Sequence, residues 1–102
     1  IGGVKICHNG VSNNINEDAA WLFTIVLDKK DFLQKKLRKL NIETNQVHFR
    51  NDRYSIFKKY IGRSKFKVMD LLEKKYLVLP IHHKITLTNA RRIANAINKI
   101  IN

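Results

Sequence analysis

The chain has 102 residues, of which 44% are hydrophobic and 27% are charged. This length allows one domain with a modest core, and this composition excludes a disordered tail. Lysine and arginine number 20 against 8 aspartates and glutamates, a formal net charge of +12, which favours an anionic partner unless the charge serves only solubility.

The chain has no segment that is expected to span a membrane. Its longest apolar run, residues 19–27, is shorter than the hydrocarbon layer requires. The single cysteine, Cys7, cannot form an internal disulfide, which suits a reducing compartment, so we expect a cytoplasmic protein. The first residue is Ile1 with no signal-like segment after it, and we expect a piece of a longer protein.

Residues 1–18 are predicted to connect into the domain. They hold three of the four glycines and only one strand-like stretch, Val4–Cys7. The compact domain is then expected over residues 19–102. Its first strand is predicted at Trp21–Leu27, where aromatic and β-branched residues dominate. Both faces of this strand are mostly apolar, which favours a central position in the sheet.

A helix is predicted after this strand, with Asp28 as its N-terminal cap and Asn41 in the left-handed conformation at its end. Four apolar side chains at helical spacing form its expected buried stripe: Phe32, Leu33, Leu37 and Leu40. The following residues, Ile42–Phe49, are predicted to form a second strand.

Two short helices are predicted next. The first is capped by Asn51 or Asp52, ends at Gly62 and carries one apolar face, made of Ile56, Phe57, Tyr60 and Ile61. The second covers residues 66–75, and three of its side chains are expected to point inward: Val68, Met69 and Leu72.

The last elements are a third strand at Tyr76–Leu79 and a long helix capped by Thr88. Five residues trace the apolar stripe of this helix: Ala90, Ile93, Ala94, Ile97 and Ile101. The order of elements predicts an α+β fold in which a sheet of about three strands is packed with helices.

The sequence offers no metal-ligand spacing among its histidines and no glycine-rich phosphate loop before a helix. Its most unusual cluster follows the second predicted strand and consists of His48, Phe49, Arg50, Asn51, Asp52, Arg53 and Tyr54. Arginine and histidine can both donate to phosphate oxygens, so this cluster is a candidate ligand site. A helix cap beside an Arg–Asp pair explains the same residues equally well.

A second class of function is suggested by residues 50–67, where lysines and arginines alternate with aromatic residues. Such a segment can bind single-stranded nucleic acid by stacking and charge. Core packing explains Phe57 and Tyr60 at least as well, because they share a helix face with Ile56 and Ile61. A small interaction domain whose charge serves only solubility is a third possibility.

Three segments resemble the C-terminal small domain of the DegT/DnrJ/StrS family: Trp21–Leu27, Ile42–Phe57 and Tyr76–His82. The resemblance runs from about Ala20 to the end of the chain. Enzymes of this family have the fold of aspartate aminotransferase (fold type I), use pyridoxal phosphate (PLP), and aminate keto-sugars attached to nucleotides.

The resemblance implies that a large domain, absent from this chain, holds PLP and its lysine, so the chain alone is not expected to transaminate. It further implies a nucleotide-diphosphate keto-sugar as substrate, glutamate as amino donor and a homodimeric whole enzyme. By this resemblance the stretch His48–Tyr54 faces substrate, with Arg50 or Arg53 near the diphosphate. No catalytic, cofactor-binding or metal-binding residue is then expected in this chain, and nucleic acid is not the expected partner.

Overall fold

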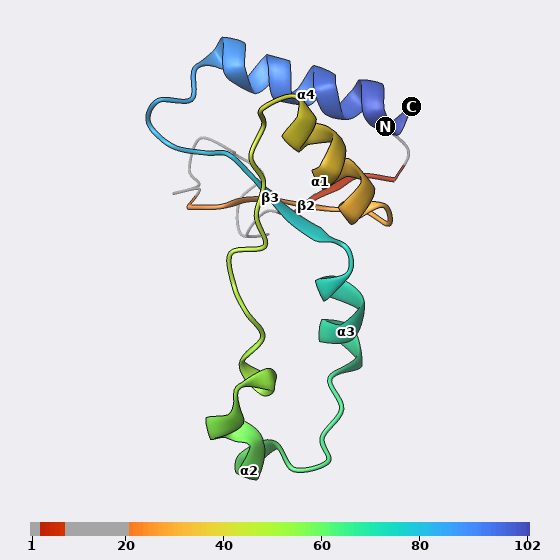
Figure 1. Ribbon diagram of the computed structural model, residues 1–102, viewed down its shortest axis with the longest axis vertical. Helices are drawn as coiled ribbons and strands as arrows, with labels where there is room; N and C mark the ends of the chain where they lie inside the picture. The colour runs from red at the N-terminus through yellow and green to blue at the C-terminus, as the bar shows by residue number, and fades with distance from the viewer. Residues whose placement is uncertain (1–2, 8–20) are drawn as a thin grey trace.

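The computed structural model describes residues 3–7 and 21–102 and confirms the predicted α+β fold. A three-stranded antiparallel sheet and two helices form a body, from which an arm of residues 49–75 projects (Figure 1). The body contains β1 (Lys5–Cys7), β2 (Phe23–Val26), α1 (Lys30–Lys39), β3 (Tyr76–Leu79) and α4 (Leu87–Ile101). The arm contains the 3-10 turns η2 (Asn51–Arg53) and η3 (Ser55–Phe57), followed by α2 (Lys58–Ile61) and α3 (Lys67–Glu73).

The strand order is β1-β2-β3, so β2 is central, as its apolar faces predicted. Ile25 of β2 lies opposite Ile6 on one side and Leu77 on the other. The predicted strand at 21–27 contains β2, and the strand predicted at 76–79 coincides with β3.

The strand predicted at Ile42–Phe49 is wrong. Only Asn45 pairs with β3, through two backbone hydrogen bonds to Val78. Val47 then has a φ of 57°, and the His48 N–H donates to the Gln46 carbonyl at 2.6 Å. These features define a γ-turn, which ends the extended conformation.

The third strand is instead β1, which lies in the segment that the sequence predicted as a connector. Most of that segment, and its boundary at residue 18, fall outside the described residues, so the division of the chain stays a prediction.

The core lies between one face of the sheet and the two helices α1 and α4 (Figure 1). Leucine and isoleucine side chains fill it: Ile25, Leu27, Leu33, Leu37, Ile42, Leu77, Leu79, Ile93 and Ile97. Burying each such side chain is worth about 1.5–3 kcal/mol, so this cluster is the main source of the stability of the fold.

The predicted helix stripes are confirmed only in part. Leu33 and Leu37 are fully buried, but Phe32 and Leu40 at the edges of the α1 stripe are exposed. In α4, Ile93 and Ile97 are buried and Ile101 is partly buried; Ala90 and Ala94 are exposed.

Three predicted caps are wrong, and one predicted helix end is confirmed. Neither Asn51 nor Asp52 caps a helix, because η2 and α2 begin without a side-chain capping bond and the Asp52 carboxylate pairs with Arg50. The Thr86 hydroxyl, rather than Thr88, accepts the capping hydrogen bond from the Asn89 N–H in α4. Asp28 does not cap α1, since its carboxylate pairs with Lys75 at 2.7 Å, and the hydrogen bond from Lys75 lowers the pKa of Asp28. Asn41 ends the first helical region with a φ of 57°, as predicted.

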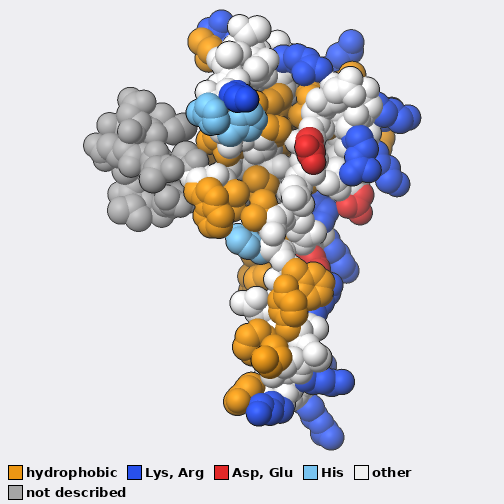
Figure 2. Space-filling view, turned by 60° about the vertical axis from the view of Figure 1, so that its left-hand side comes forward, with side chains coloured by type: hydrophobic (Ala, Val, Ile, Leu, Met, Phe, Trp, Pro, Cys, Tyr) orange, Lys and Arg blue, Asp and Glu red, His pale blue; other side chains and the backbone are white. Residues whose placement is uncertain are grey.

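The arm has no apolar core. Gly62 ends α2 with a φ of 55°, as predicted, and α3 lies within the helix predicted at 66–75. The side chains expected to point inward are exposed, however: Ile56, Phe57, Tyr60, Val68, Met69 and Leu72. Figure 2 shows hydrophobic side chains along one side of the arm and Lys and Arg side chains at its tip.

Within the described ranges, no helix is both long enough and apolar enough to cross a bilayer.

Candidate substrate-binding site

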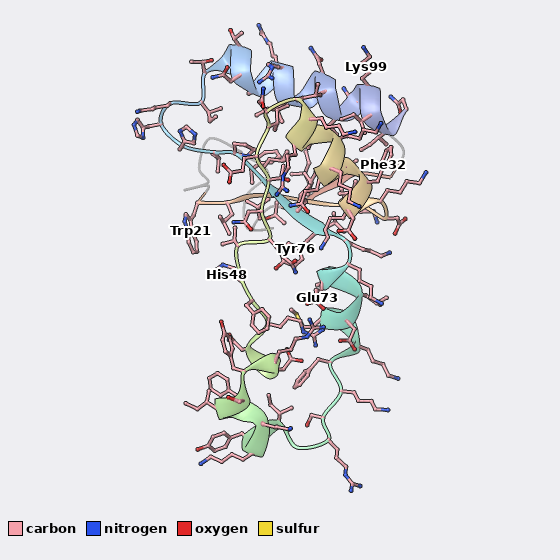
Figure 3. The ribbon with its side chains drawn as sticks, viewed as in Figure 1. Trp21, Phe32, His48, Glu73, Tyr76 and Lys99 are labelled. Atoms are coloured by element: carbon pink, nitrogen blue, oxygen red, sulfur yellow. The ribbon has the colours of Figure 1, made fainter. Side chains whose placement is uncertain are left out.

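The stretch His48–Tyr54 lies where the arm leaves the body (Figure 3). It begins at the γ-turn and continues through η2. Five of its residues are exposed to solvent, Asp52 is partly buried and Arg50 is buried. The structure therefore keeps these residues together, with Arg50 beneath the others.

Arg50 is the only buried residue of the arm, and carboxylates surround its guanidinium. Its Nε and Nη2 donate to the two oxygens of Asp52, at 2.9 and 2.6 Å. Its Nη1 donates to Asp70 at 2.5 Å and to Glu73 at 3.4 Å. The hydrogen bonds that Arg50 donates to Asp52 and Asp70 raise the pKa of Arg50, and the bond that Asp52 accepts from Arg50 lowers the pKa of Asp52.

Arg53 makes a bidentate pair with Glu73, in which both N···O distances are 2.6 Å. Arg50 and Arg53 come from the outgoing segment of the arm, whereas Asp70 and Glu73 lie on α3, the returning segment (Figure 1). This ion-pair cluster joins the two segments at the base of the arm. The terminal nitrogens of both arginines are thus engaged by carboxylates, and their contact with a diphosphate stays a prediction.

Aromatic rings occupy the exposed side of the same region. Trp21, just before β2, meets His48 edge to face with ring centroids 5.7 Å apart. Phe49 and Tyr54 form a second such pair at 5.0 Å. Trp21 was predicted only as part of a strand face, but 74% of it is exposed.

The backbone of this region is held from the body. The Tyr76 hydroxyl lies 2.8 Å from the Gln46 carbonyl oxygen and 3.1 Å from that of His48, so it donates across the γ-turn. The Lys30 ammonium donates to the Glu73 carbonyl at 2.7 Å and reaches the Gln46 side chain at 3.5 Å.

Sequence reasoning did not find Trp21, Tyr76, Asp70 or Glu73 as parts of this region. One signal was available for the two acids: they stand at i and i+3 on a predicted helix, which places both carboxylates on one face. No comparable signal marks Trp21 or Tyr76, since their contacts span about 30 residues.

A shallow hollow of about 310 Å³ adjoins these residues and is lined by residues 45–50 and Glu73. A larger groove of about 520 Å³ lies between the sheet and α4, and its lining is almost entirely apolar. The hollow is the better candidate for a polar ligand, because amide, imidazole and carboxylate groups converge on it.

A sequence model of the DegT/DnrJ/EryC1/StrS aminotransferase family matches residues 2–98. The chain belongs to this family.

Two solved structures share the fold of this DegT/DnrJ/EryC1/StrS chain. The sugar aminotransferase CalS13 from Micromonospora echinospora matches 97% of the chain with a TM-score of 0.79 and 19% sequence identity. Helicobacter pylori PseC, an aminotransferase involved in the biosynthesis of pseudoaminic acid, matches 78% of it with a TM-score of 0.64 and 19% identity. The chain covers 26% and 23% of these proteins, respectively. A search of curated proteins finds no match.

The described part of this family member does not fit PLP. A PLP site needs a lysine that faces an enclosed pocket and can form a Schiff base. Among the described lysines only Lys30 and Lys75 are partly buried; Lys30 donates to Glu73 and Lys75 pairs with Asp28. Neither ammonium lines the hollow.

Proposed function

We propose that this chain is the substrate-positioning part of a PLP-dependent aminotransferase that converts a nucleotide-diphosphate keto-sugar into an amino sugar. Membership of an aminotransferase family carries this proposal. The likeness of the fold to CalS13, a sugar aminotransferase, supports a sugar as substrate.

In this proposal the cofactor belongs to a large domain outside these residues. The chain covers only about a quarter of the two solved proteins, and its described lysines do not make a PLP site. PLP supplies the electron sink for moving an amino group from a donor, here glutamate, to the keto carbon. The residues of this chain then bind and orient the sugar nucleotide and exclude water from it.

His48, Phe49 and Tyr54 are the members of the predicted stretch best placed to touch substrate, since all three are exposed, His48 and Phe49 line the hollow, and the Tyr54 ring packs on Phe49. The His48 imidazole can hydrogen-bond a sugar hydroxyl or a phosphate oxygen. Arg50, Asp52 and Arg53 position these side chains by joining the two segments of the arm. Asn51 starts η2 between the two arginines and is exposed.

We further propose that the whole enzyme is a homodimer and that a surface of this dimer outside the present residues covers the arm. The arm exposes the apolar side chains of Ile56, Phe57 and Tyr60 without any buried apolar neighbour of its own. A contiguous exposed patch of this kind marks an interaction surface.

The test of the proposed function is steady-state kinetics of the whole enzyme carrying His48→Ala. Loss of one hydrogen bond to substrate weakens binding by about tenfold, so KM for the keto-sugar nucleotide rises by that factor and KM for glutamate stays unchanged. His83→Ala removes another exposed imidazole, from the loop before α4, and serves as the matched control.

Unchanged keto-sugar kinetics in the His48 variant would show that this stretch does not touch substrate. Absence of any amino transfer to nucleotide-linked keto-sugars would remove the proposed function as a whole. In that case, salt-dependent binding of single-stranded oligonucleotides would favour the nucleic-acid alternative.

A further inference from the structure

Trp21 and His48 form a ledge at the junction of body and arm, here named the Trp21–His48 ledge. Trp21 is 74% exposed and its ring contacts that of His48 at an interplanar angle of 66°. Figure 3 shows both side chains on the same side of the molecule. An indole left this exposed contributes little to the core, although its large flat face is well suited to stacking.

The ledge is held in place by the body rather than by its own packing. Val47, the residue before His48, has a φ of 57°, where a β-branched side chain is strained. The Tyr76 hydroxyl bridges the carbonyls on both sides of this residue, and the Asn45–Val78 bridge fixes the residues before it. His48 is therefore presented to Trp21 by a backbone that β3 constrains.

The surroundings of the ledge indicate what it would hold. Asn45 and Gln46 line the adjoining hollow. Their side-chain oxygens accept from the Gln46 N–H and the Lys30 ammonium, which leaves the amide NH2 groups to donate to the polar edge of a planar ring. The arginines nearest the ledge, Arg50 and Arg53, are engaged by carboxylates, so stacking rather than charge is what the ledge offers. Exposed rings beside amide groups fit a planar aromatic ring with a polar edge better than a neutral sugar.

We propose that the Trp21–His48 ledge is a stacking subsite for the nucleobase of a nucleotide-linked ligand. This inference rests on the proposed function and adds to it the contact that recognises the nucleotide half of the substrate. Trp21 lies outside the stretch that the sequence singled out, and the base would stack on its exposed face.

The test is saturation-transfer NMR on the 102-residue chain with uridine and adenosine monophosphates as probes. The base protons of both nucleotides should receive saturation, and ribose 5-phosphate should bind at least about fivefold more weakly, since base–aromatic stacking contributes about 1–3 kcal/mol, a factor of about 5–150. Trp21→Ala should weaken nucleotide binding by about tenfold. Tyr60→Ala, which removes a ring that is 76% exposed at the arm tip, should leave it unchanged.

Circular dichroism of both variants verifies the fold, and both changes are at exposed positions. Equal nucleotide binding by Trp21→Ala and the wild type would overturn the proposal. Equal binding of ribose 5-phosphate would overturn it too, because the phosphate alone would then account for the affinity. Tight oligonucleotide binding that does not depend on Trp21 would also overturn the proposal, because charge rather than stacking would then account for the binding.

Failure of this test is separable from failure of the proposed function. A ledge that does not bind nucleotides leaves the effect of His48→Ala on the keto-sugar KM intact. Conversely, if the whole enzyme had no aminotransferase activity, the saturation-transfer experiment would still report whether the ledge binds nucleotides.

Discussion

The body and the arm use the same residue types in different ways. In the body, isoleucines and leucines at helical and strand spacing meet between a sheet and two helices, and nine of them are buried together. In the arm, apolar residues at similar spacing remain exposed, and the only buried residue is an arginine held by carboxylates. Apolar residues at helical spacing therefore identify a face that other residues can bury. In the body, a second layer of the same chain buries that face; in the arm, no such layer does.

The comparison has a functional side. A region with its own core can serve as a scaffold, whereas a region held by ion pairs can present exposed rings to a ligand or to another protein surface. The candidate site lies at the boundary between the two regions, where Tyr76 of the body contacts the backbone of His48.

The largest effect is expected from a cavity in the body. Leu37→Ala removes a fully buried side chain of α1 and should lower the free energy of unfolding by about 2–5 kcal/mol. Ile56→Ala, at a 70% exposed position of the arm, should change it by less than about 0.5 kcal/mol. Urea denaturation followed by circular dichroism measures both values; similar losses would show that the arm has a core of its own.

A smaller effect is expected at the start of α4. Thr86→Ala removes the hydroxyl that accepts from the Asn89 N–H, at a cost of about 1 kcal/mol in the free energy of unfolding. Thr88→Ala is the matched control, because Thr88 lies inside the helix and makes no capping bond. If the Thr88 variant lost as much stability as the Thr86 variant, the helix would begin two residues later than described.

The smallest effect on global stability is expected from acid, which should act on the arm. The pKa of Asp52 is lowered in the folded chain by Arg50. The stability that this carboxylate contributes is thus complete above its unfolded pKa of about 3.9 and is lost as the pH falls through the lower folded value. Amide NMR signals of residues 50–73 should lose dispersion in that range before those of α1 and α4.

Asp52→Asn mimics this protonation at neutral pH and should loosen the same residues. An arm whose signals stay dispersed in acid, together with a body that unfolds first, would contradict the assignment of the ion-pair cluster as the contact that holds the arm.

The sequence predicted the body better than the arm because the stability of the body depends on local periodicity. The strands at Phe23–Val26 and Tyr76–Leu79, predicted from their apolar composition, and the helical stripe through Ile93 and Ile97 all form as expected. The strand predicted at Ile42–Phe49 failed because a turn at Val47, held by a tyrosine far along the chain, interrupts a β-like composition.

The sequence predicted which consecutive residues form the candidate site, but not which distant residues they contact. His48–Tyr54 stays together at the base of the arm, as a local cluster must. The partners of its arginines are about 20 residues away, on α3, so the engagement of both guanidiniums was not visible in the local pattern. Trp21 was not predicted as part of the site because it begins an apolar segment, Trp21–Leu27, whose composition is typical of a buried strand.

The single bridge between Asn45 and Val78 closes a long excursion of the chain at one point on the outer edge of β3. The entropy of closing such a loop grows slowly, by about 0.6 kcal/mol for each doubling of its length. Insertions or deletions beyond this closure point therefore cost the scaffold little. The arm is thus expected to tolerate changes in length that the sheet and helices of the body would not.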